Sequence, residues 1–198
     1  MPGLINLQVS DNPGNRDDEV VDYIVHKTLE PRENDEYFII DPFLDADGDI
    51  FEHFKLKNFE GSLWSYIINE ICISMDRGTI NILTGEQLRR LSERVSFTSN
   101  SNYPLIIPHP DTKLSNCQIN VARYKIRPGN NTVPNKLHDR WILKKPISGN
   151  NVGIHIGPSL GDIKGKDATI TLFDDSIIQK AMDRFAHIWY IAGQSRAL

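Results

Sequence analysis

The chain has 198 residues, of which 39% are hydrophobic and 24% charged, and its formal net charge is −4. This length favours one domain over two, and no apolar run approaches the roughly 18 residues of a membrane span. A negative net charge gives no general attraction to nucleic acid or anionic lipid, so a polyanion would need a local basic patch. The use of only two cysteines, Cys72 and Cys117, and the lack of a leader-like start predict a cytoplasmic protein.

The first half of the chain predicts alternating helices and strands. A strand is expected from Glu36 until Asp41-Pro42 stops it, and Gly78 is expected to cap the longer helix that follows. Strand, helix, strand and helix in this order predict parallel strands joined by right-handed crossovers. The other expected elements are a Gly/Pro/Asn-rich tail over 1–16, a short helix over 17–30, the longer helix over 61–78, a strand over 79–85 and a helix over 85–95.

The second half is expected to add antiparallel strands and a closing helix. A polar, proline-punctuated connection over 96–116 precedes them, and its role as lid, partner surface or plain linker stays open. The elements expected after it are strands over 117–127, 136–145, 151–160 and 167–173, an amphipathic helix over 174–190 and a tail over 193–198. The predicted class is a single α/β domain over 17–192, with a mixed sheet flanked by helices on both faces.

The sequence does not predict a metal or nucleotide site. An acidic cluster consists of Asp41, Asp45, Asp47 and Asp49. An EF-hand that begins at Asp45 would need Gly and Glu where Ile50 and Leu56 stand, and the six histidines lack zinc-site spacing. We therefore expect no metal and no cofactor, and a looser divalent-cation site at the acidic cluster is the alternative. Asp41 differs from the other acids because it ends a predicted strand, where ligands gather in α/β sheets, although capping the next turn is the alternative.

The stretch "KLHDRWILKK" carries the side chains best suited to phosphate chemistry. His138 can attack phosphorus or move a proton, and Arg140 offers a planar fork of donors to phosphate oxygens. Because strand side chains alternate, His138 and Arg140 share one face and Asp139 points away. Ser159 and nearby backbone N–H groups could complete an anion pocket. The alternative is an ordinary strand start with a surface Asp–Arg pair.

A basic segment surrounds this stretch. Between residues 123 and 145, Asp139 is the one acidic residue among seven basic residues. These are Arg123, Lys125, Arg127, Lys136, Arg140, Lys144 and Lys145. A local patch of this kind could hold a phosphate-bearing ligand, and a solvated basic strand pair is the alternative.

Residues 35–190 resemble the phospholipase D-like superfamily in the order of "YFIIDPFLD", "INILTG", "LHDRWIL" and "GIHIGPSLGDI". The resemblance is to single-motif H-D-R members, such as the C-terminal domain of MIT-domain proteins and stand-alone bacterial and phage domains. It implies a catalytic histidine at His138, a phosphate-holding Arg140 in the lysine position, and Ser159 as the family serine after Gly157. The acidic position of the motif holds Lys145, which is a departure from the family. A single motif implies a homodimer that joins two His138 side chains.

Two functions follow from the resemblance. The first is a metal-independent phosphodiesterase or nuclease acting on nucleic acid through His138, with bacterial defence as a setting. The second is a non-catalytic module that binds a phosphate-bearing ligand or a protein partner, like the MIT C-terminal adaptor domains. In either case, the residues expected to bind phosphate are Arg140, Lys144, Lys145, Gly157 and Ser159.

Overall fold

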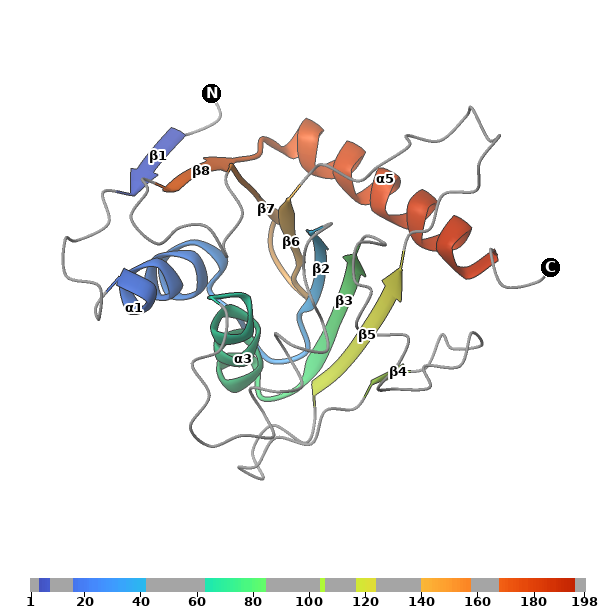
Figure 1. Ribbon diagram of the computed structural model, residues 1–198, viewed down its shortest axis with the longest axis horizontal. Helices are drawn as coiled ribbons and strands as arrows, with labels where there is room; N and C mark the ends of the chain where they lie inside the picture. Colours follow the sequence, from blue (N-terminus) through green and yellow to red (C-terminus); the bar gives the residue numbers. More distant parts are fainter. Residues whose placement is uncertain are drawn as a thin grey trace.

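A computed structural model describes residues 4–7, 16–41, 63–84, 104–105, 117–123, 140–157 and 168–194. These residues form one mixed sheet of eight strands in the order β1-β8-β7-β6-β2-β3-β5-β4, with helices beside it (Figure 1). The strands are β1 (Leu4–Leu7), β2 (Glu36–Asp41), β3 (Gly78–Thr84), β4 (Pro104–Leu105), β5 (Cys117–Arg123), β6 (Trp141–Lys145), β7 (Val152–Ile156) and β8 (Ala168–Leu172). The helices are α1 (Arg16–Val21), the π-helix η1 (Asp22–Leu29), α3 (Leu63–Met75) and α5 (Asp175–Gln194).

The predicted α/β class and mixed sheet are confirmed. Strands β2, β3 and β5 run parallel. β6 pairs antiparallel with β2, β7 pairs antiparallel with β6, and β8 pairs antiparallel with β7. β5 was expected among the antiparallel additions, but it pairs in parallel with β3 and so extends the parallel core. β1, which comes from the expected tail, pairs antiparallel with β8 at the edge of the sheet.

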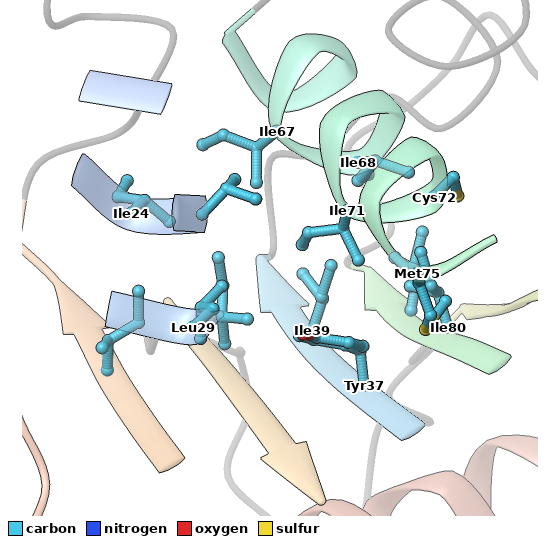
Figure 2. Close-up of a cluster of buried hydrophobic side chains, with 14 of the residues drawn as sticks. Ile24, Leu29, Tyr37, Ile39, Ile67, Ile68, Ile71, Cys72, Met75 and Ile80 are labelled. Atoms are coloured by element: carbon cyan, nitrogen blue, oxygen red, sulfur yellow. The ribbon is translucent and has the colours of Figure 1, made fainter. Parts of the chain in front are cut away.

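Alternating side chains of the central strands separate two cores. Tyr37 and Ile39 of β2 belong to the cluster that α1, η1 and α3 cover, and Figure 2 shows side chains of η1 and α3 meeting them. Phe38 and Ile40 face the opposite way, into the cluster beneath α5. The alternation arises because successive strand side chains leave opposite faces. The described helices therefore cover both faces of the sheet, with α5 alone on one side.

The helix ends differ in detail from the expectations. The short N-terminal helix begins as α1 and continues as the π-helix η1, which ends where Glu30 takes a left-handed conformation with φ of 45°. α3 ends at Met75, and Asp76 turns the chain with φ of 59°, so Gly78 is not the cap. Gly78 instead lets two backbones approach, because a Cβ there would lie 2.6 Å from the carbonyl oxygen of Asp35.

Several predicted features lie outside the described residues. They are the helix over 85–95, most of the connection over 96–116, the acids Asp45, Asp47 and Asp49, and the site residues His138, Asp139 and Ser159. α5 extends to Gln194, four residues beyond its expected end. None of the described helices is long and apolar enough to cross a bilayer.

Candidate functional site

Polar residues meet at the edge of the sheet where β2 and β3 end. Asp41 is the last residue of β2 and pairs with Thr84, the last residue of β3. Ile40 pairs with Trp141, so Arg140 lies next to Asp41 across the strand pair. The carbonyl of Arg140 accepts a hydrogen bond from the N–H of Ile156 at the end of β7, which brings Gly157 to the same edge. We call Asp41, Thr84, Arg140 and Gly157 the carboxyl edge.

The guanidinium of Arg140 has a defined place at the carboxyl edge. Its Nε lies 3.7 Å from Oδ1 of Asp41, and its Nη1 donates a hydrogen bond of 3.2 Å to the carbonyl oxygen of Gly157. The Asp41 side chain is 1% exposed and that of Arg140 is 16% exposed. A buried carboxylate and a carbonyl therefore hold the guanidinium while part of the side chain reaches solvent. Guanidinium groups suit phosphate oxygens because their five N–H donors lie in a fixed plane.

Lys144, which was expected to bind phosphate, instead makes a buried ion pair and hydrogen bonds within the protein. Its Nζ lies 3.0 Å from Oδ2 of Asp35 and donates hydrogen bonds of 2.8 and 2.7 Å to the carbonyl oxygens of Leu29 and Glu30. The side chain is only 5% exposed. Four residues of strand span about 13 Å, which separates Lys144 from Arg140. Its ammonium joins the end of η1 to the sheet, so its position does not support a role in phosphate binding.

Lys145 lies on the opposite face of the sheet from Lys144. Its side chain is 59% exposed, and its Nζ is 3.9 Å from Oε2 of Glu36, at the start of β2. It therefore sits at the other end of β6 from Arg140 and faces α5. Lys145 therefore adds no positive charge to the carboxyl edge.

The predicted site residues are thus only partly together. The structure brings Arg140, Gly157 and Asp41 to one edge and separates them from Lys144 and Lys145. Of the predicted basic segment, Arg123 pairs through its backbone with Thr84 at the same edge, whereas Lys125, Arg127 and Lys136 lie outside the described residues.

Two polar features of the structure were not predicted from the sequence. One is Asp35, the buried partner of Lys144, whose position in "RENDEY" resembles an ordinary turn. The other is a row of Glu36, Asn81 and Asn120 beneath α5, which Asn81 signals as a polar residue inside the apolar run "TINIL". Within the described ranges, no three His, Cys, Asp or Glu side chains gather as metal ligands would.

No protein-family model matches the chain, and no curated protein matches it.

Proposed function

We propose that this protein is a phospholipase D-like domain that recognises a phosphodiester at the carboxyl edge. The observation that carries the proposal is the guanidinium of Arg140, held between the buried Asp41 and the carbonyl of Gly157 at the ends of the parallel strands. Ligands of α/β sheets gather at such strand ends. The resemblance to phospholipase D-like proteins implies a phosphate-binding cation at the position of Arg140.

The remaining motif residues are close to this edge in the sequence. His138 precedes Arg140 by two residues, and Ser159 follows Gly157 by two residues. The proposed phosphodiesterase attacks phosphorus with His138 and expels one oxygen of the ester, which takes a proton from His138 of a second copy. Water then releases the phosphate from the first histidine.

The second candidate is a module of the same fold that binds without cleaving. The ion pair between Asp41 and Arg140 supports binding without cleavage. The Asp41 carboxylate lies 3.7 Å from Arg140, so it offsets part of the positive charge that would stabilise a phosphoryl transition state. Arginine in place of the family lysine also changes shape and reach. Phosphate binding is common to both candidates, and cleavage separates them.

The separating experiment measures cleavage of DNA, RNA and bis(p-nitrophenyl) phosphate in EDTA. The variants are His138→Ala, Arg140→Gln and the control Arg77→Gln, each first checked for folding by circular dichroism. Arg77 is 60% exposed and lies just before β3, at the opposite edge of the sheet. The enzyme predicts EDTA-resistant cleavage that the first two variants lose and the control keeps.

Two other outcomes are informative. A folded wild type that binds a phosphodiester without cleaving any substrate supports the binding module and rejects the enzyme. A folded wild type that neither cleaves nor binds rejects both candidates. If cleavage occurs, its rate per protomer should fall when dilution dissociates the dimer, because each site needs two His138 side chains.

A further inference from the structure

A hollow of about 790 Å³ lies between the sheet and the stretch of α5 from Gln179 to Tyr190. Glu36, Asn81 and Lys145 line it from the sheet, and Met182, Trp189 and Tyr190 line it from α5. Pockets of about 300–1,000 Å³ are typical of small-molecule sites. We call this hollow the α5 cleft. It lies toward the start of β2, at the other end of the strand and on the other face from the carboxyl edge.

Glu36 and Asn81, which line the floor of the α5 cleft, belong to a hydrogen-bonded polar row that crosses three strands. Nδ2 of Asn120 donates to Oδ1 of Asn81 over 2.8 Å, and Nδ2 of Asn81 donates to Oε1 of Glu36 over 3.1 Å. Lys145 extends the row from β6 through its ion pair with Glu36. Asn81 is only 8% exposed, although nearby positions on the same face, such as Leu83, are apolar core. Packing alone would favour an apolar residue there, because burying an amide is costly unless its hydrogen bonds are made.

The polar row presents fixed donors and acceptors to the α5 cleft. An amide can make four hydrogen bonds, and its two neighbours in the row orient the amide of Asn81. Glu36 adds an acceptor and Lys145 adds donors. A ligand edge with alternating donors and acceptors would match such a floor.

The wall of the α5 cleft is aromatic. Phe38 meets Phe185 edge-on with ring centroids 5.1 Å apart, and Trp189 stacks on Phe185 at 5.3 Å with 20° between the ring planes. Trp189 is half-buried at the end of this array, and the next residue, Tyr190, is 65% exposed. Such a wall suits a flat ring, because aromatic side chains stack on the faces of other aromatic systems.

Charge narrows the class of ligand further. Glu36 and Asp183 line the α5 cleft with negative charge, and Lys145 is the one cation among its described lining residues. This balance disfavours a polyphosphate and favours an uncharged ligand. A nucleobase is a flat, uncharged heterocycle with a mixed donor and acceptor edge, so it fits both the aromatic wall and the polar row. We propose that the α5 cleft binds a nucleoside, with the base packed on the wall at Trp189 and hydrogen-bonded to the row at Asn81 and Glu36.

The test titrates the full chain with adenosine, guanosine, cytidine and uridine by calorimetry and ligand-observed NMR. At least one nucleoside should bind saturably with a dissociation constant at or below about 1 mM. Trp189→Leu should weaken that binding about tenfold, which is the typical effect of losing one base–aromatic stack. Glu36→Gln should also weaken it, whereas the control Glu33→Gln, an exposed acid outside the α5 cleft, should not. The matching nucleoside triphosphate should bind more weakly than the nucleoside.

Two results would overturn the proposal. One is the absence of saturable binding of any nucleoside to the folded wild type. The other is unchanged affinity in both folded variants, Trp189→Leu and Glu36→Gln. Arg140→Gln should leave nucleoside binding intact, so failure of the α5 cleft and failure of the carboxyl edge are separable results.

Discussion

Replacing Lys144 with methionine should destabilise the protein strongly. The ammonium of Lys144 has three partners, the Asp35 carboxylate and the carbonyl oxygens of Leu29 and Glu30, all within 3.0 Å. Methionine keeps most of the length and apolar volume of the side chain but removes its charge and donors. The carboxylate of Asp35, whose side chain is 2% exposed, would then stay buried without its cation.

The expected loss is about 3–5 kcal/mol of unfolding free energy, the usual cost of removing one partner of a buried ion pair. The low exposure of both side chains leaves little solvent to screen the stranded charge. Such a loss is a large share of the roughly 5–15 kcal/mol that stabilises a typical domain. The double variant Asp35→Asn/Lys144→Met should lose less than the sum of the single variants, because the residues interact directly.

Lys145→Met is the matched control for this prediction. Its side chain is 59% exposed and its ion pair with Glu36 spans 3.9 Å, so the expected loss is below about 1 kcal/mol. Urea unfolding followed by circular dichroism measures both variants, and equal slopes against denaturant make the comparison valid. If Lys144→Met lies within about 1 kcal/mol of Lys145→Met, the buried ion pair does not hold η1 to the sheet.

Three further predictions concern other parts of the fold. Gly78→Ala should lower the midpoint of urea unfolding, because the new Cβ would lie 2.6 Å from the carbonyl oxygen of Asp35; an unchanged midpoint would contradict that close approach. Cys72 and Cys117 are each 3% exposed, so both thiols should react with a thiol reagent far more slowly in the folded protein than in urea; equal rates would show that they are accessible. Hydrogen bonds from the Ser176 hydroxyl and the Ile177 N–H lower the pKa of Asp174. The charged Asp174 therefore stabilises the start of α5 at any pH above the ordinary aspartate pKa. This stabilisation is lost as the pH falls through the lowered pKa of Asp174. The difference in melting temperature between wild type and Asp174→Ala should accordingly shrink in acid, and a difference that persists there would exclude the charged cap.

Local patterns in the sequence predict the elements better than they predict how the elements meet. The apolar spacing of α3 correctly places Ile67, Ile68, Ile71, Cys72 and Met75 in the core. An apolar run indicates the central strand β2, which is covered on both faces, and alternation of apolar and polar residues indicates β5. Strand direction is a different matter, since alternation is the same in parallel and antiparallel pairs. The parallel pairing of β5 with β3 was missed for that reason.

Some residues of the candidate site could likewise be predicted from local sequence patterns, and others could not. Arg140 and Asp41 could be placed at strand ends from local signals, and the structure brings them together. Lys144 could not be placed, because its ammonium is buried against three acceptors from the end of η1 and the turn after it, more than 100 residues away in the sequence. A basic residue at a strand end looks the same in the sequence whether it binds a ligand or a buried carboxylate.

Binding of a short abasic DNA strand tests the central claim most directly. Such a strand carries phosphodiesters without bases. It can therefore bind at the carboxyl edge, but it has no base that could stack on the aromatic wall of the α5 cleft. Wild type should bind it, and folded Arg140→Gln should bind it about tenfold more weakly, because a charge-assisted hydrogen bond to phosphate is lost. Arg77→Gln should bind like wild type. Equal affinity of wild type and Arg140→Gln would contradict the assignment of the carboxyl edge as a phosphodiester site.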